Sequence, residues 1–188
     1  TKQASNVLLE NGGRLDVLSD GVADATTVDK GGILAVSNGG TATGVTMKEG
    51  GALIADSAST VSGTNARGEF SIDAASGKAS GLWLENGGRF SVKAGAVAAN
   101  TTVGNGGELS VGTGGGLSGI TSLTANANLT VTGDVVSTGT IENAGSITFA
   151  PEQSGKAMAR LPANAFTSRT LTTTNLVGQG GTINMNIN

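Results

Sequence analysis

The sequence contains no cysteine and no histidine, only two prolines, and few aromatic (3%) or charged (13%) residues. Without cysteine, neither disulfides nor thiolate metal sites can staple the fold. Without histidine, the chain lacks the usual zinc ligand and the most common general base. The composition therefore argues against a zinc centre and against catalysis by a histidine base, and no cofactor is expected.

Long apolar runs are also missing: no stretch approaches about 18 consecutive apolar residues, so no membrane-spanning helix is expected. The net charge of −3 does not resemble the basic footprint of a nucleic-acid binder. Glycine is abundant, at 32 of 188 residues, yet 37% of the residues are hydrophobic, which favours an ordered, turn-rich chain over a disordered linker. Because the chain starts at Thr1 without a leader, we expect it to be a portion of a longer protein.

One short pattern, a small residue followed by alternating polar and apolar residues, recurs along the chain. The first six copies are spaced by 19, 19, 17, 20 and 19 residues. Within each copy the two apolar residues fall on one face of a strand. The copies predict eight coils, at residues 13–17, 32–36, 51–55, 68–72, 88–92, 107–111, 127–131 and 145–149.

Each coil contains two further segments. A second alternating run precedes the pattern and is joined to it by a turn such as Asn11-Gly12-Gly13, where glycine and asparagine tolerate positive φ. A third segment is short and mostly made of small residues, as expected at a tight corner. Its centres are Ala23, Ala42, Val61, Ala79, Ala98 and Leu117.

Two architectures compete for this alternating pattern. An antiparallel sandwich would explain the alternation but not the return of the same residue type every 19 positions. In a solenoid the coils stack about 4.8 Å apart, so equivalent positions form columns and must repeat. The sequence therefore predicts an all-β parallel β-helix (β-solenoid) with about 19 residues per coil. Crossovers between parallel strands predict a right-handed one.

The segment 7–17 and its later copies resemble the repeats of AIDA and antigen-43 type self-associating autotransporter adhesins, most strongly over residues 4–116. The resemblance implies a non-catalytic, surface-exposed passenger segment at the extracellular face of a Gram-negative outer membrane. It implies a role in bacterial aggregation, biofilm formation or host attachment. The implied partners are another copy of the chain or a host surface receptor, with the parent protein tethered by a C-terminal barrel outside this sequence.

The chain divides into regular coils with Gly-Gly turns at 1–116 and the last coils plus a C-terminal cap at 117–188. The second region resembles the autochaperone-like end of such passengers, which the resemblance implies nucleates folding during secretion. Pro151 and Pro162 bracket an insertion that lacks alternation. We expect a loop and hairpin within 151–188 to cover the open strand edges of the last coil.

A column of charged residues suggests an enzymatic alternative. Glu10 and Asp29 occupy equivalent positions in adjacent coils, about 5 Å apart, a separation that suits a retaining glycosidase. The same column continues with Lys48, Arg67 and Glu85, which favours a solvated row of charges. A carbohydrate-active β-helix enzyme is therefore the lesser alternative.

Aspartates next to glycines also raise the question of calcium binding, which nonapeptide solenoids achieve with a strict repeat. Asp16 is replaced by other residue types in the later coils, and Asp20 and Asp24 flank one turn only. No metal site is predicted.

The single tryptophan, Trp83, lies between Leu82 and Leu84, so alternation places it on the outside. There it could anchor a partner or a sugar, or pack against the chain's own C-terminal extension.

Two compatible functions follow: an adhesive, self-associating rod, or a folding and stalk module with adhesion carried upstream. The candidate interaction surface is the outer column Thr27, Thr46, Asn65, Trp83 and Thr102.

Overall fold

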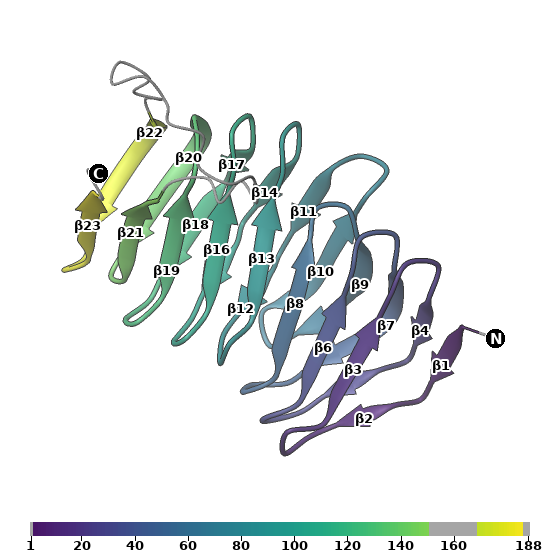
Figure 1. Cartoon of the computed structure of the whole chain (residues 1–188). Helices are drawn as coiled ribbons and strands as arrows, with labels where there is room; N and C mark the ends of the chain where they lie inside the picture. Colours follow the sequence, from purple (N-terminus) through teal and green to yellow (C-terminus); the bar gives the residue numbers. More distant parts are fainter. Residues whose placement is uncertain (1, 151–168, 186–188) are drawn as a thin grey trace, which may run out of the picture.

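The computed structural model describes residues 2–150 and 169–185, and these residues form a β-solenoid whose two ends lie far apart (Figure 1). Their strands make two sheets. The 15-stranded sheet, here sheet A, contains β1 (Gln3–Ser5), β2 (Leu8–Leu9), β4 (Val22–Asp24), β5 (Thr27–Val28), β7 (Thr41–Met47), β9 (Thr60–Asn65), β10 (Gly68–Asp73), β11 (Lys78–Ser80), β12 (Trp83–Leu84), β14 (Val97–Ala99), β15 (Thr102–Val103), β17 (Gly116–Ser118), β18 (Ile120–Leu123), β20 (Val135–Asn143) and β22 (Leu171–Gly178). The 8-stranded sheet B contains β3 (Arg14–Val17), β6 (Ile33–Val36), β8 (Ala52–Asp56), β13 (Arg89–Val92), β16 (Glu108–Val111), β19 (Asn128–Val131), β21 (Ser146–Phe149) and β23 (Thr182–Met185).

The regular coils confirm the predicted repeat. Leu15 lies opposite Leu34 and Leu34 lies opposite Leu53, each 19 residues further along, so the interior is a set of apolar columns. The predicted third segment is a strand of sheet A with an inward small residue: Ala23 and Ala42 are fully buried and pair across coils. Small side chains here allow the sheets to converge and the core to stay closed.

The Gly-Gly turns are required by the stacking. At the turn before β16, Gly106 has φ of +74°, which L-residues with a side chain rarely adopt. A Cβ on the next residue, Gly107, would clash with the backbone carbonyl of Leu84 in the preceding coil. The first glycine makes the turn and the second lets the coils approach to hydrogen-bonding distance.

The interpretation of residues 68–72 as a coil is wrong. This segment is β10, which pairs antiparallel with β9 on one side and with β11 on the other, inside sheet A. It therefore contributes no strand to sheet B. An antiparallel strand alternates with the same period of two, so its local sequence matches the repeat although its direction does not.

The hairpin changes the register in sheet B. Because residues 57–80 contribute no strand to that sheet, β13 pairs directly with β8. The repeat would place Arg89 opposite Ala52, but Arg89 lies opposite Ile54, two residues further along. A shift of two keeps inward residues inward, since faces alternate with period two. Phe90 thus stacks on Ala55 in the core.

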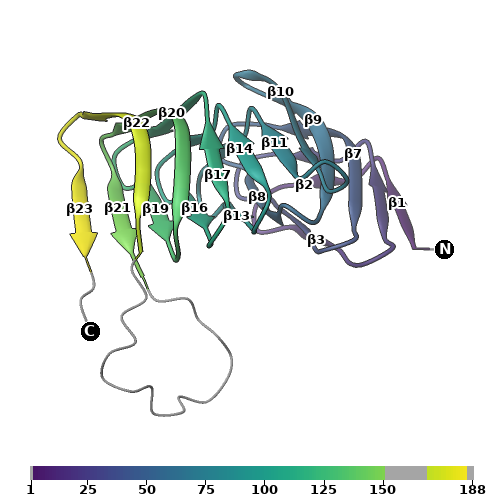
Figure 2. The same cartoon turned by 90° about the horizontal axis from the view of Figure 1, so that it is seen from above.

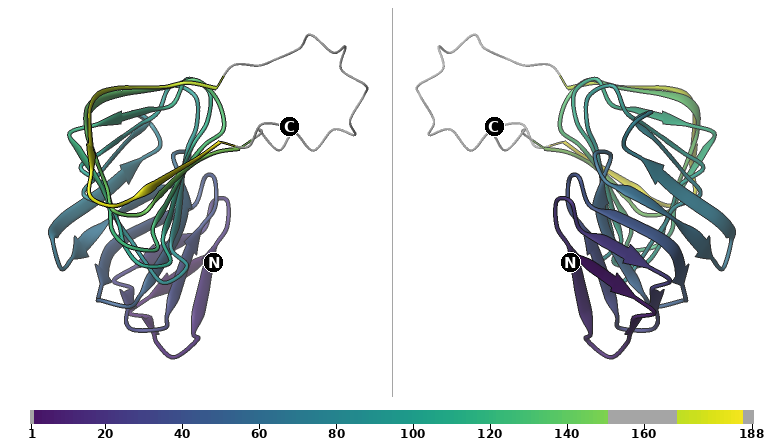
Figure 3. Two further views of the ribbon diagram at one scale, coloured as in Figure 1. Left: turned by 90° about the vertical axis from the view of Figure 1, so that its left-hand side faces the viewer. Right: turned by 90° about the vertical axis from the view of Figure 1, so that its right-hand side faces the viewer.

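The hairpin also makes sheet A longer than sheet B. Among the described residues, the stack in sheet A from β1 to β22 has two more strands than sheet B, namely β9 and β10. Two extra strands add about 10 Å to one side of the rod. The hairpin acts as a wedge: it projects from the side of the rod in Figure 2, and the N-terminal coils are displaced from the later ones in the end-on views of Figure 3.

The C-terminal strands form a further coil. The expected closing hairpin is wrong within the described residues, because β22 pairs in parallel with β20 and β23 pairs in parallel with β21. Sheet B therefore still has eight strands, because β23 adds one at its C-terminal end while residues 68–72 add none between β8 and β13. The Pro151–Pro162 insertion, like the rest of 151–168, lies outside the described residues.

Deleting residues 60–77 should remove the wedge without unfolding the rod. The distance from Gly51 to Gly88 would become 19 residues, and Lys78 would follow Ser59 in the place of Thr60, which pairs with Thr41 of β7. We expect a folded variant whose β13 returns to the unshifted register. Small-angle scattering should show a straighter rod, and unchanged curvature would contradict the wedge.

Candidate interaction surface

The predicted outer column is continuous only through its first half. Thr27 lies opposite Thr46, as expected. The next residue is Thr64, since β7 and β9 pair Thr46 with Thr64 after an irregularity in the register. Asn65 is therefore not a member of the column, and its inclusion was wrong by one residue.

Asn65 shapes the tip of the β9–β10 hairpin. Its side-chain oxygen accepts a hydrogen bond from the backbone N–H of Arg67 at 2.8 Å. Its side-chain nitrogen donates to the carbonyl of Gly81 at 2.9 Å. The amide thus closes the turn and attaches it to the segment that leads into β12.

Trp83 packs against this hairpin. The indole is half-buried, and the guanidinium carbon of Arg67 lies 5.3 Å from the ring centroid, within cation–π range. A Cβ on Gly104, in the following coil, would lie 3.1 Å from the indole nitrogen. Thr102, the cross-strand neighbour of Trp83, is only 8% exposed. Trp83 therefore lies on the outer face as predicted, but Thr102 is covered.

In the Glu10 and Asp29 column, Asp29 forms an ion pair with the column member one coil further along. The Lys48 ammonium lies 2.7 Å from the Asp29 carboxylate. The hydrogen bond from Lys48, helped by one from the Lys30 backbone N–H, holds the pKa of Asp29 below its usual 3.8. A glycosidase acid needs a raised pKa, so this geometry opposes the catalytic interpretation.

Arg67 and Glu85, predicted to continue that column, have structural partners. Arg67 lies at the hairpin tip, over the Trp83 ring, and is therefore not part of the charged column. Glu85 accepts a hydrogen bond from the backbone N–H of Gly50 at 2.6 Å. In the regular coils this glycine N–H donates to a glycine carbonyl of the next coil, as Gly31 does to Gly50. The register shift removes the glycine carbonyl that would accept from the Gly50 N–H. The Glu85 carboxylate takes its place as the acceptor.

The aspartates considered for calcium are engaged separately. Asp16 pairs with Arg14 at 2.7 Å, and Asp20 lies 3.5 Å from Lys2. Asp24 accepts a hydrogen bond from the hydroxyl of Thr43. Within residues 2–150 and 169–185, no three acidic side chains gather around a common point that could hold a metal ion.

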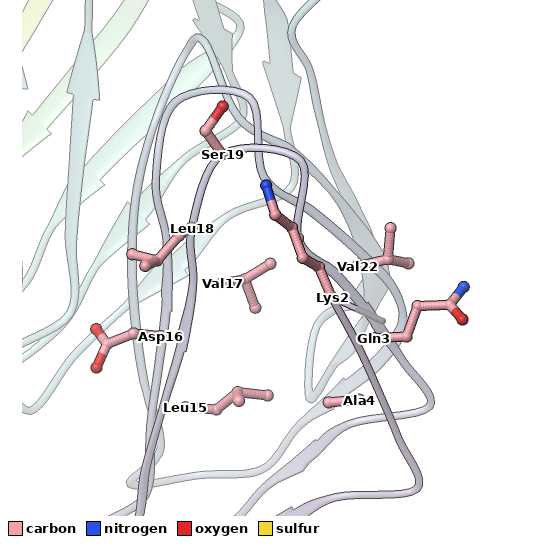
Figure 4. A pocket seen from close by; sticks show the side chains of 10 residues that line it. Lys2, Gln3, Ala4, Leu15, Asp16, Val17, Leu18, Ser19 and Val22 are labelled. Carbon is pink, nitrogen blue, oxygen red and sulfur yellow. The ribbon is translucent and has the colours of Figure 1, made fainter.

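A hollow of about 470 Å³ lies at the first coil. Figure 4 shows Leu15, Val17 and Ala4 pointing toward its centre, while Asp16 and Gln3 point away. The lining is thus the end of the interior apolar columns. It has the character of core and offers no chemistry beyond burial.

A second hollow, of about 370 Å³, lies beside the hairpin tip. Its lining is polar and comes from elements far apart in the sequence. The outer column that continues from Trp83 toward the C-terminus forms part of this hollow. In that column Thr102 lies opposite Ser122, and Ser122 lies opposite Glu142. The lining residues are Arg67, Glu69, Gly81, Leu82, Asn100, Thr102, Ile120, Ser122 and Glu142. Sequence reasoning missed this site.

The sequence matches a family described as "Adhesin of bacterial autotransporter system, probable stalk" over residues 1–51 and 62–127. The match covers well over half of the chain. The protein belongs to this autotransporter adhesin family. It is a non-enzymatic passenger segment, in agreement with the paired charges above. The unmatched residues 52–61 contain β8 and the start of β9, where the register shifts.

A solved structure, the crystal structure of a TibC-catalyzed hyper-glycosylated TibA fragment, is also similar. The identity is 19%, the alignment covers 98% of this chain and 82% of that one, and the TM-score is 0.34. The fold described above rests on the strand pairing of this adhesin segment itself. A search of curated proteins gives no match. Across the described parts of the segment, no helix is long and apolar enough to cross a membrane.

The Asp29–Lys48 pair predicts a pH-dependent contribution to stability. Because the pKa of Asp29 is lowered in the folded state, the contribution is present above the usual value of 3.8 and lost as pH falls through the lower folded value. Replacing Lys48 with Met should therefore lower the urea midpoint at neutral pH but not at about pH 2. Lys30→Met is the control, and a difference that persists in acid would contradict the assignment.

Proposed function

We propose that this segment is an adhesive rod displayed at the extracellular face of a Gram-negative outer membrane, where it contributes to bacterial aggregation, biofilm formation or host attachment. Family membership supports the surface location. The partner is a second copy of the chain or a host surface receptor. The outer face of sheet A around the β9–β10 hairpin is the contact surface.

The hairpin carries this proposal. In the regular coils, outer charges such as Lys48 and Asp29 are paired at 2.7 Å. The hairpin instead projects from the rod and holds Arg67 over the Trp83 ring, at the edge of a hollow that Arg67 helps to line. A projecting, partly apolar and charged feature next to a hollow is suited to recognition. Many such weak contacts between two cells add up through avidity.

A second function is supported by the C-terminal coils. We infer that these coils start folding of the passenger during secretion, in agreement with the autochaperone-like sequence. The longest strands of the described chain are β20, with nine residues, and β22, with eight, and they pair along most of their length. Each earlier coil then buries its apolar residues on the coil already formed.

Purified chain should associate reversibly as its concentration rises. We expect the weight-average sedimentation coefficient to increase over a wide concentration range, and beads coated with the chain to clump. Beads coated with Leu109→Asp, which places a charge in a fully buried position, are the control for a folded surface. A chain that stays monomeric, on beads that stay dispersed, would move self-association to another part of the adhesin.

Folding from the C-terminal end predicts unequal effects of matched core substitutions. Leu34 and Ile147 belong to the inward face of sheet B and are 0% and 1% exposed. Leu34→Asp should leave a protease-resistant C-terminal core, because the later coils do not depend on it. Ile147→Asp should leave the whole chain protease-sensitive. Limited proteolysis with mass spectrometry measures both, and resistant cores of equal length would exclude the directional order.

A further inference from the structure

The hairpin tip presents a fixed cation. Gly68, with φ of +129°, and the Asn65 hydrogen bond to the Arg67 N–H close the tip tightly. The Arg67 side chain is held over the Trp83 ring and is still exposed. Because the turn and the ring restrict the guanidinium, little conformational entropy is lost when it meets a carboxylate.

The neighbouring hollow presents two carboxylates. Glu69 comes from β10 and Glu142 from β20, and both line it. Among the described residues neither carboxylate takes part in an ion pair or a side-chain hydrogen bond, in contrast to Asp29 and Asp56. Beside them Ile120 is an apolar side chain with 51% exposure. The hollow therefore offers unpaired negative charge next to a small apolar platform.

We propose that the hollow receives the hairpin tip of a second copy of this chain, so that Arg67 of each copy binds Glu142 of the other. This rests on the proposed self-association and names its contact. A two-fold interface requires a surface complementary to itself. A projection with a cation beside a hollow with carboxylates has that property in shape and in charge. Guanidinium–carboxylate hydrogen bonds supply direction, and Ile120 becomes covered.

The second copy is favoured over a basic peptide because the required cation, Arg67, is held on the same surface of this chain, next to the carboxylates of the hollow. A single contact of this size is weak. On a cell surface many copies act together, so weak reversible pairs are sufficient for adhesion between cells.

Charge reversal with rescue tests the contact. Arg67→Glu and Glu142→Lys should each weaken self-association about tenfold or more. In a dimer of either variant, like charges meet at both of the 67–142 contacts. In an equimolar mixture of the two variants both contacts of the mixed dimer are again between opposite charges, so association should return to nearly the wild-type level. Sedimentation velocity at a fixed total concentration measures all three samples. Arg89→Glu and Glu108→Lys, which reverse an exposed pair in sheet B, are the matched controls and should leave association unchanged.

Each outcome decides between the proposals. Variants that associate like the wild type, or a mixture that does not recover, would overturn the Arg67–Glu142 contact and leave self-association standing. A basic peptide that binds the wild type while the chain itself stays monomeric would overturn both and identify a heterologous partner. Far-ultraviolet circular dichroism should show that every variant is folded.

Discussion

The backbone hydrogen-bond ladder between coils is the constraint on which the rest of this molecule depends. Each coil can satisfy its N–H and C=O groups only if the next coil follows at strand spacing and in register. That requirement puts Leu15, Leu34 and Leu53 in one column and forces a glycine at Gly107, where a Cβ would clash with the preceding coil. The repeat in the sequence is the result of this ladder.

The same constraint explains which parts of the fold could be predicted. The period, the three segments per coil and the inward residues follow from stacking, so they are visible in the sequence. The direction of a strand is not, because alternation of inward and outward residues looks the same both ways. Residues 68–72 were therefore mistaken for a coil, although the spacings of 17 and 20 around them marked the irregularity.

The candidate surface was harder to predict, since it depends on a slip of one residue and on contacts between distant elements. Thr64 instead of Asn65 continues the outer column because the ladder shifts within β7 and β9. The hollow brings Arg67 near Glu142, and no local pattern relates residues so far apart in the chain. The turn sequence Asn65-Ala66-Arg67-Gly68 is the one local signal that could have indicated a hairpin.

A solenoid can accept such an insertion because its energetics are nearly one-dimensional: each coil contacts only its neighbours, so the disturbance stays between β8 and β13. The register shift must be even, since an odd shift would turn Phe90 and Val92 toward water. Where the shift removes a ladder acceptor from the Gly50 N–H, the Glu85 carboxylate accepts that hydrogen bond. The hairpin thus adds a bend and a projecting surface while the core columns on both sides stay intact, and the surface can change in sequence without disturbing the rod.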